Sequence, residues 1–239
     1  MKTNLSVNIN KVALIRNARG ENLPNLAQVA KDCEKFGAEG ITVHPRPDER
    51  HVRYDDIAPL QSIVQTEFNI EGNPVPKFME MVLAHRPHQC TLVPDKPTAL
   101  TSTEGWDTIN NVEFLTETIQ KLKDAGIRVS IFLNADEELV KGAKAVGADR
   151  IEFYTGTFAK TFGTAANKEI IERHARCAEL AHNLGLGVNA GHDLDLNNLR
   201  FYKQNMPYLS EVSIGHALIS DALYLGLETT IGKYLACLE

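Results

Sequence analysis

The feature that most constrains the fold of this chain is a repeated unit, in which a helix-like segment ends at a glycine and a short strand-like segment follows. The unit occurs at Gly37, Gly126, Gly147 and Gly185. Glycine just past a helix readily adopts the left-handed conformation that turns the chain sharply into a strand. The same criteria predict eight strands, at residues 5–10, 40–44, 68–72, 89–94, 128–134, 150–155, 187–191 and 211–216.

Segments able to form helices separate these strands. Residues 25–36 and 136–146 carry apolar side chains at helical spacing and are predicted to be amphipathic outer helices. Eight strands alternating with helices over 239 residues indicate parallel βαβ units that close into a (β/α)8 TIM barrel, with residues 1–239 as one domain. An open doubly wound sheet is the alternative, but the segment NINKVALIRNARG has neither a GxGxxG turn nor a P-loop.

Composition limits the classes of partner. With 25 Lys and Arg against 31 Asp and Glu, the net charge is -6, which argues against nucleic acid as a partner. The sequence shows no long apolar stretch and no leader-like start, so we expect a cytoplasmic protein with no membrane partner. Cys33, Cys90, Cys177 and Cys237 lack paired spacing, which predicts reduced thiols.

Several predicted strands alternate apolar and polar residues, whereas strands buried on both faces usually read as continuous apolar runs. Val7 and Ile9, for example, alternate with Asn8 and Asn10. With a period of two, the apolar set can face the helices and the polar set the barrel axis. The inward set would then include Asn8, His44, Glu71, Glu152 and Asn189. These groups can either satisfy one another through hydrogen bonds and buried water or form a reactive site, and their clustering near strand carboxyl ends favours the site.

Three histidines follow predicted strands and should converge at that end, namely His44, His192 and His216. Imidazole titrates near neutrality, and a desolvated glutamate can approach the same range. Acid-base catalysis is therefore predicted for His44, Glu71, Glu152 and His192. Four other histidines are predicted to lie on the surface or in packing positions, namely His85, His88, His174 and His182.

Basic side chains follow the first two strands. Arg16 and Arg19 come after the first, and Arg46, Arg50 and His51 after the second. Any one of them could be an ordinary solvated charge, but arginine beyond a strand end is also well suited to bind phosphate. The pair Gly215 and His216 opens a predicted helix, whose N-terminus offers a second anion site. Two anionic subsites are therefore conceivable.

Three alternatives remain. Metal hydrolysis is disfavoured, because asparagines stand at positions 8 and 10 where an HxH pair would be expected and no HExxH occurs. A Schiff-base aldolase would use Lys11 or Lys96, neither of which is clearly inward on a strand. A barrel that only senses a phosphorylated ligand would bind without turnover, and the polar interior argues against it.

The segments NIN...RNARG, GITVHPRPDERH, FNIEGN, LVPD...LTS, IEFYTG, VNAGHDL and SIGHALI together resemble the pyridoxine 5'-phosphate synthase (PdxJ) family, in order along nearly the whole chain. The resemblance implies a barrel enzyme that condenses 1-deoxy-D-xylulose 5-phosphate with 3-amino-2-oxopropyl phosphate, releasing phosphate and water and closing the pyridine ring of vitamin B6. It also implies no metal, no redox cofactor and a symmetric oligomer, an octamer in well-known members.

The resemblance also implies roles for individual residues. His44 and Glu71 match proton acceptors, His192 a proton donor and Glu152 a group that stabilises the transition state. The positions that match the amino-ketone phosphate site are Asn8, Arg19, Gly215 and His216, and those that match the deoxyxylulose phosphate site are Arg46, His51 and Thr101. Asp193 is expected to bind substrate, although many members have Gly there. Many members likewise have Asp-His at Asn10 and Lys11, so no contact is assigned to these two.

Overall fold

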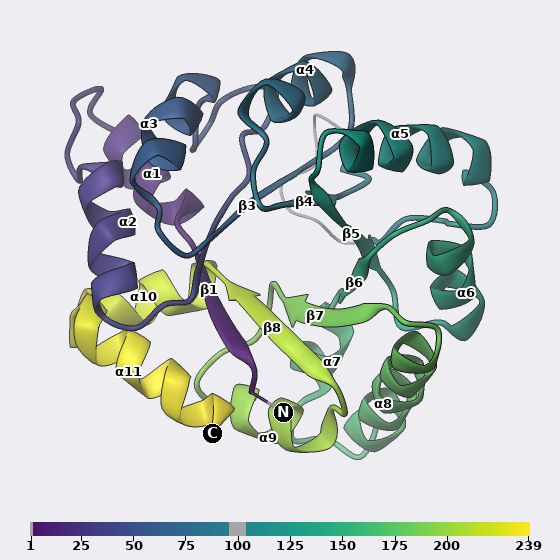
Figure 1. Cartoon of the computed structure of the whole chain (residues 1–239). Coiled ribbons are helices and arrows are strands. Elements are labelled where there is room, and N and C mark those ends of the chain that lie inside the picture. The colour runs from purple at the N-terminus through teal and green to yellow at the C-terminus, as the bar shows by residue number, and fades with distance from the viewer. Residues whose placement is uncertain (1, 96–103) are drawn as a thin grey trace.

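Eight parallel strands close into a barrel in the computed structural model, which describes residues 2–95 and 104–239 (Figure 1). Each strand pairs with the next along the chain, and β8 pairs with β1. The strands are β1 (Asn4–Asn8), β2 (Gly40–Val43), β3 (Glu67–Gly72), β4 (Gln89–Leu92), β5 (Arg128–Leu133), β6 (Arg150–Phe153), β7 (Gly187–Gly191) and β8 (Leu209–Ile214). The predicted TIM-barrel fold is confirmed.

Helices surround this barrel (Figure 1). They are α1 (Asn10–Asn17), α2 (Leu26–Lys35), α3 (Ile57–Ile63), α4 (Pro76–His85), α5 (Val112–Asp124), α6 (Glu137–Ala145), α7 (Gly156–Thr161), α8 (Asn167–Asn183), α9 (Leu199–Asn205), α10 (His216–Leu225) and α11 (Leu227–Leu238), with a 3-10 turn η1 (Tyr54–Asp56). The four glycines of the repeated unit have φ between 75° and 104°, as the left-handed turn requires. Among the described residues, no helix is both long and apolar enough to span a membrane.

Two strand boundaries differ from the prediction. The strand predicted at residues 5–10 ends at Asn8, because the Asn8 side chain accepts a hydrogen bond from the Asn10 backbone N–H at 3.1 Å and α1 starts there. His216 does not end a strand either: β8 stops at Ile214, and His216 is the first residue of α10. Both differences place polar groups in the turns above the barrel.

The apolar core lies between the strands and the helices. Val7, Ile41, Ile70 and Ile151 alternate with polar neighbours along their strands and are fully buried in this core. The polar neighbours point to the barrel axis, which confirms the predicted alternation.

Midway along the axis, four polar side chains of β1 to β4 form hydrogen bonds with one another. Ser6 Oγ lies 2.7 Å from Thr42 Oγ1, which also accepts a hydrogen bond from Asn69 Nδ2 at 3.3 Å. Thr91 in turn donates to Asn69 Oδ1 at 3.1 Å. This layer belongs to the structure rather than to a reactive site, since partnered polar groups are the ordinary state of a protein interior.

Candidate active site

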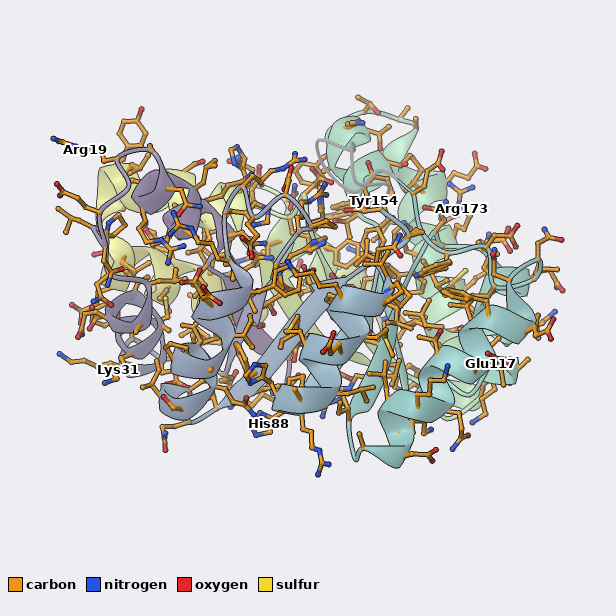
Figure 2. The ribbon with its side chains drawn as sticks, turned by 90° about the horizontal axis from the view of Figure 1, so that it is seen from above. Arg19, Lys31, His88, Glu117, Tyr154 and Arg173 are labelled. Carbon is orange, nitrogen blue, oxygen red and sulfur yellow. The ribbon has the colours of Figure 1, made fainter. Side chains whose placement is uncertain are left out.

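The carboxyl ends of the strands surround a cavity of about 610 Å³. Its lining residues are Asn8, Asn10, Lys11, His44, Arg46, His51, Glu71, Thr91, Val93, Phe132, Glu152, His192, Asp193, Asp195, Ser213, Gly215, His216 and Ala217. Figure 2 views the barrel from the side, with Tyr154, which follows β6, at this end and His88, which precedes β4, at the other. The cavity therefore lies at the end where barrel enzymes hold their active sites.

The structure brings most of the predicted site residues together. The four residues predicted for acid-base catalysis all line the cavity: His44, Glu71, Glu152 and His192. Six of the predicted substrate-binding residues do so as well, namely Asn8, Arg46, His51, Asp193, Gly215 and His216. Arg19 is exposed beyond α1 and points away from the barrel in Figure 2, and it does not line the cavity. Thr101 lies outside the described residues.

Two buried carboxyls occupy the floor of the cavity. Burial raises the pKa of Glu71 to about 8, with the charges of Asp95 and Glu211 acting in the same direction. Burial, together with the charge of Glu71, raises the pKa of Glu152 well above 4.5. Asn8 Nδ2 also donates to Glu71 Oε2 at 3.4 Å. At pH 7 Glu71 therefore holds a proton that an ordinary glutamate would have released, and the raised pKa of Glu152 favours its protonated form in the same way.

Two imidazoles that line the same cavity, those of His44 and His51, have pKa values shifted in the opposite direction. Burial and the charge of Arg46 lower the pKa of His44 well below 6.5 and that of His51 to about 4. The two rings meet edge to face, with centroids 6.2 Å apart. The His44 backbone N–H donates to Asn10 Oδ1 at 2.9 Å, which ties the end of β2 to the start of α1. At pH 7 both rings are neutral, so each has one nitrogen able to accept a proton.

His192 is held by a tight turn after β7. Its φ is 46°, and a Cβ on the preceding Gly191 would lie 2.1 Å from the Ser213 backbone oxygen. His192 Nδ1 lies 2.7 Å from Asp193 Oδ2. Burial acts to raise the pKa of Asp193, but the hydrogen bond and charge of His192 outweigh it and hold that pKa below its usual range. Asp193 therefore orients this ring with a carboxylate, as in other carboxylate-histidine pairs.

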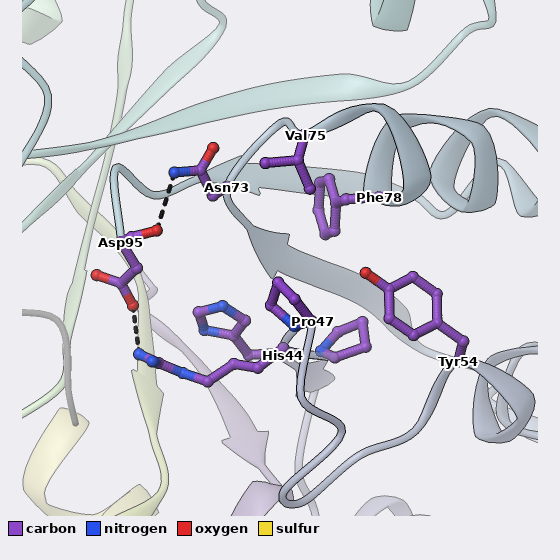
Figure 3. A pocket seen from close by; sticks show the side chains of 9 residues that line it. His44, Pro47, Tyr54, Asn73, Val75, Phe78 and Asp95 are labelled. Atoms are coloured by element: carbon purple, nitrogen blue, oxygen red, sulfur yellow. Dashed lines mark hydrogen bonds and ion pairs between the residues drawn. The ribbon is translucent and has the colours of Figure 1, made fainter. Parts of the chain in front are cut away.

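Arg46 reaches the cavity from the loop after β2 and is anchored by an ion pair with Asp95 (Figure 3). Asn73 Nδ2 in turn donates to the Asp95 backbone oxygen at 2.9 Å. The residues in Figure 3 enclose a smaller space of about 10 Å³, which is roughly the room for one water molecule. The guanidinium is thus positioned before any ligand arrives.

Other basic residues take different places. The interpretation of Arg16 as a possible anion ligand is wrong. The Arg16 side chain is buried, and its guanidinium donates to both Asp56 carboxylate oxygens, at 2.6 and 2.8 Å. Arg50 pairs with Asp48 and is not a lining residue. Lys11 does line the cavity, although its sequence position did not show it, and Lys96 lies outside the described residues.

The histidines assigned to packing have such roles where the structure gives their contacts. His88 Nδ1 accepts a hydrogen bond from the Phe68 backbone N–H at 3.1 Å, at the amino end of the barrel. His174 is buried in α8, with Nδ1 3.0 Å from the Tyr202 hydroxyl. Neither residue lines the cavity.

Sequence reasoning missed two residues that shape the cavity. Phe132 lines it, and its ring centroid lies 6.5 Å from that of His192. Its position two residues after Ser130 on β5 gives it inward parity, which was the available signal. Asp95 follows β4 by three residues, and its place past a strand end was the only sign of its role.

A metal centre is not a feature of the site as described. Within residues 2–95 and 104–239, no group of three or more His, Cys, Asp or Glu residues is arranged to hold a metal ion. The side chains that line the cavity can transfer protons and bind anions, and Lys11 adds an amine.

Comparisons with known proteins agree on one family. A family model described as "Pyridoxal phosphate biosynthesis protein PdxJ" matches residues 5–239. A pyridoxine 5'-phosphate synthase from Cytophaga hutchinsonii is 59% identical over 234 residues, which cover 98% of each chain. The synthase from Christiangramia forsetii is 55% identical over 237 residues, which cover 99% of this chain and 100% of the relative.

A solved structure gives a likeness of fold alone. The thiamine phosphate pyrophosphorylase from Pyrococcus furiosus matches with a TM-score of 0.65 at 12% identity, covering 98% of this chain and 95% of that one. At such low identity the likeness extends to the barrel and not to the chemistry.

Proposed function

Because the chain belongs to the PdxJ family and is therefore an enzyme of pyridoxine 5'-phosphate synthesis, we propose that it joins 1-deoxy-D-xylulose 5-phosphate to 3-amino-2-oxopropyl phosphate. The reaction releases phosphate and water and closes the pyridine ring. It is redox-neutral but needs proton transfers at several carbons and oxygens. The observation that carries the proposal is the gathering of two glutamate carboxyls and four imidazoles around one cavity, among them Glu71, Glu152, His44 and His192.

The proposed roles follow from the protonation states. Neutral His44 accepts a proton from the substrate, and Glu71, with a pKa of about 8, exchanges one readily near neutral pH. Protonated Glu152 donates a hydrogen bond to an oxygen that becomes negative in the transition state. His192, oriented by Asp193, returns a proton to the leaving group.

The two phosphates are proposed to bind at separate places. Arg46 and His51, with Thr101, bind the deoxyxylulose phosphate. The proposed ligands of the amino-ketone phosphate include Asn8, Gly215 and His216, which line the cavity where the backbone amides at the start of α10 favour an anion. Arg19 is the fourth proposed ligand, and its side chain would have to turn toward the cavity to reach the phosphate. Holding both substrates in one cavity removes much of the entropic barrier to joining them.

The direct test is to mix purified protein with both substrates and to detect pyridoxine 5'-phosphate by absorbance and mass. Product should form only when both substrates are present. If the protein forms no pyridoxine 5'-phosphate when both substrates are present, the proposed reaction is contradicted.

Catalysis is proposed to need no metal and no other cofactor. Full turnover should survive dialysis against a chelator, because the proposed steps use side-chain protons only. Activity that is lost on dialysis and restored by one divalent ion would overturn this part of the proposal.

The presence of Lys11 in the cavity wall keeps one alternative reaction open, a Schiff-base aldolase. Borohydride should trap a carbonyl substrate covalently on Lys11 if that reaction operates, and Lys11→Met should abolish the trapping. Under the proposed function, neither the wild-type chain nor the variant forms an adduct.

We propose that the protein works as a homo-oligomer, an octamer by family resemblance. We propose no nucleic acid and no membrane as its partner. Light scattering coupled to size exclusion should give the mass of eight 26.5 kDa chains. A single-chain mass at working concentration would contradict it.

A further inference from the structure

Two side chains at the end of α1, those of Arg16 and Asn17, have no role in the mechanism proposed above. Both belong to the segment RNARG, and both reach the loop that joins β2 to η1. This β2–η1 loop, residues 44–53, carries two of the proposed ligands of the deoxyxylulose phosphate, Arg46 and His51. The end of α1 therefore contacts the backbone of a segment that forms part of the cavity wall.

The Asn17 side chain contacts three consecutive carbonyl groups of this loop. Its Nδ2 donates to the His51 backbone oxygen at 2.7 Å and to those of Arg50 and Glu49 at 3.2 and 3.4 Å. Glu49 has a φ of 52°, in the left-handed region that residues other than glycine rarely adopt. The Asn17 amide therefore supplies hydrogen-bond donors at a turn whose backbone conformation is not intrinsically favoured.

The Arg16 side chain holds the far end of the same loop. Its guanidinium donates to both carboxylate oxygens of Asp56, at 2.6 and 2.8 Å, and Nη2 also donates to the His51 backbone oxygen at 3.4 Å. Arg16 Nε donates to Asn17 Oδ1 at 3.1 Å, which fixes the direction of the Asn17 amide. Arg16 is only 5% exposed, so little water competes for these hydrogen bonds. Two side chains of α1 thus donate to one carbonyl group, that of His51.

The other side of His51 faces the cavity. Its side chain is buried and lines the cavity, while its backbone oxygen is bound by α1. His51 Nδ1 has no hydrogen-bond partner among the residues that the structure describes. The ring is therefore placed by the backbone that carries it and by its edge-to-face contact with His44.

We propose, on the basis of the function proposed above, that Arg16 and Asn17 are positioning residues, which hold the β2–η1 loop in the conformation that binds the deoxyxylulose phosphate through His51. Neither residue lines the cavity, so neither is proposed to touch substrate. A loop that is held in place before the ligand arrives loses less conformational entropy on binding. The effect is greater on His51 than on Arg46, because Arg46 is also anchored by Asp95.

Asn17→Leu tests this role, because leucine has a similar shape but neither a hydrogen-bond donor nor a charge. The affinity for 1-deoxy-D-xylulose 5-phosphate should fall by at least about fivefold, since the hydrogen bonds that hold the loop are lost. The affinity for 3-amino-2-oxopropyl phosphate should stay at its wild-type value. Calorimetric titration of each ligand measures both affinities, and Asn17→Gln, which keeps the amide, should restore the first in part.

A second readout needs no substrate. Burial lowers the pKa of His51 to about 4, so its ring signal in the nuclear magnetic resonance spectrum should titrate well below the usual midpoint of 6.5 in the wild type. Loosening the loop exposes the ring to water, so the midpoint in Asn17→Leu should rise by at least about one pH unit. His51→Asn identifies the signal. The variant changes none of the charged groups that act on His51, namely Arg46, Asp48 and Arg50 of the loop and Lys11 of α1.

Asn167→Leu is the matched control. Asn167 Nδ2 donates to the Phe158 backbone oxygen at 2.9 Å and thereby joins the start of α8 to α7, which are not part of the β2–η1 loop. This variant should lose stability but should leave both ligand affinities and the His51 midpoint at their wild-type values. Should Asn17→Leu fail to fold, Asn17→Ser provides the same test, because one hydroxyl donates only one hydrogen bond.

A His51 midpoint that stays at its wild-type value in the folded variant would overturn the inference, and so would an equal loss of affinity for both substrates. A wild-type protein that binds neither substrate would refute the proposed function. If its His51 midpoint nevertheless rises on Asn17→Leu, the control of the His51 position by α1 still holds.

Discussion

At the amino ends of the strands, the charged side chains that point into the barrel are joined in ion pairs, whereas at the carboxyl ends buried carboxyls and imidazoles surround an open cavity. Glu67 pairs with Arg128, which also donates to Gln89 Oε1 at 2.9 Å. Both charges of this pair therefore have a partner of opposite sign.

At the carboxyl ends of the strands, the buried glutamates are not paired with cations. In the part of the chain that the structure describes, neither Glu71 nor Glu152 forms an ion pair, and both carboxyls have raised pKa values. A buried carboxyl must be neutralised, either by a cation or by a proton. Glu67 is neutralised by a cation, which holds its charge in place, whereas the raised pKa values of Glu71 and Glu152 favour a proton, which can be transferred. One strand, β3, carries an example of each four residues apart.

The contrast between the two ends of the barrel is tested most directly by making the same substitution, Glu to Gln, at each end. Glu71→Gln should reduce turnover by about 100-fold to 10,000-fold, because an amide cannot exchange the proton that the proposed reaction needs. Glu67→Gln should change turnover only slightly but lower the free energy of unfolding by about 1–2 kcal/mol, since it removes one partner of a partly exposed ion pair. Measured kcat and urea midpoints distinguish the two effects.

The opposite result would remove the basis of the contrast. Wild-type turnover in Glu71→Gln would show that this carboxyl carries no proton in the reaction. A loss of turnover in Glu67→Gln as large as in Glu71→Gln would show that the two ends are not functionally separate.

A smaller effect is expected for the arginines proposed to hold phosphate. Arg46→Ala should lower the binding affinity for 1-deoxy-D-xylulose 5-phosphate by about tenfold to a hundredfold, since a charged hydrogen bond to phosphate contributes about 1.5–3 kcal/mol. Arg19→Ala should lower the binding affinity for 3-amino-2-oxopropyl phosphate and leave that for 1-deoxy-D-xylulose 5-phosphate unchanged. Calorimetric titration of each ligand into both variants measures this, and equal weakening of both ligands by either change would refute the two-subsite arrangement.

The local part of the structure could be predicted from the sequence. Alternation of Val7 with Asn8, and of Ile151 with Glu152, follows from strand geometry alone, so the inward position of both polar residues was readable. The carboxyl-end position of His44 and His192 follows from the order of strands in a barrel.

The charge partners could not be predicted, because they are distant along the chain. Arg16 and Arg19 are three residues apart, yet one is buried against Asp56, 40 positions away, and the other is exposed. The Arg46 pair with Asp95 likewise joins loops 49 positions apart. The periodicity of the sequence predicts the face of a strand on which a side chain lies. The partner that the side chain contacts there is known only from the folded barrel.

The pH dependence of stability should also distinguish the two kinds of group, because carboxyls and imidazoles should act in opposite directions. The pKa of Glu71 rises from 4.5 to about 8 on folding, so the stability it contributes is present below pH 4.5 and is lost as pH rises toward 8. The pKa of His51 falls from 6.5 to about 4, so its contribution is present above pH 6.5 and is lost as pH falls toward 4.

These two directions can be separated by two substitutions. Glu71→Gln should remove a decline of the unfolding free energy of up to about 1 kcal/mol per pH unit, which extends from about pH 4.5 to 8. Only the part of this decline above pH 6.5 is free of the opposing contribution of His51. His51→Asn should flatten the acid side and leave the alkaline side intact, so each variant is the control for the other. Urea unfolding at a series of pH values gives both slopes. An alkaline slope in Glu71→Gln equal to that of the wild type would mean that Glu71 ionises in the folded protein as it does in the unfolded chain, and the cavity end would then hold its carboxyls as anions, like the amino end.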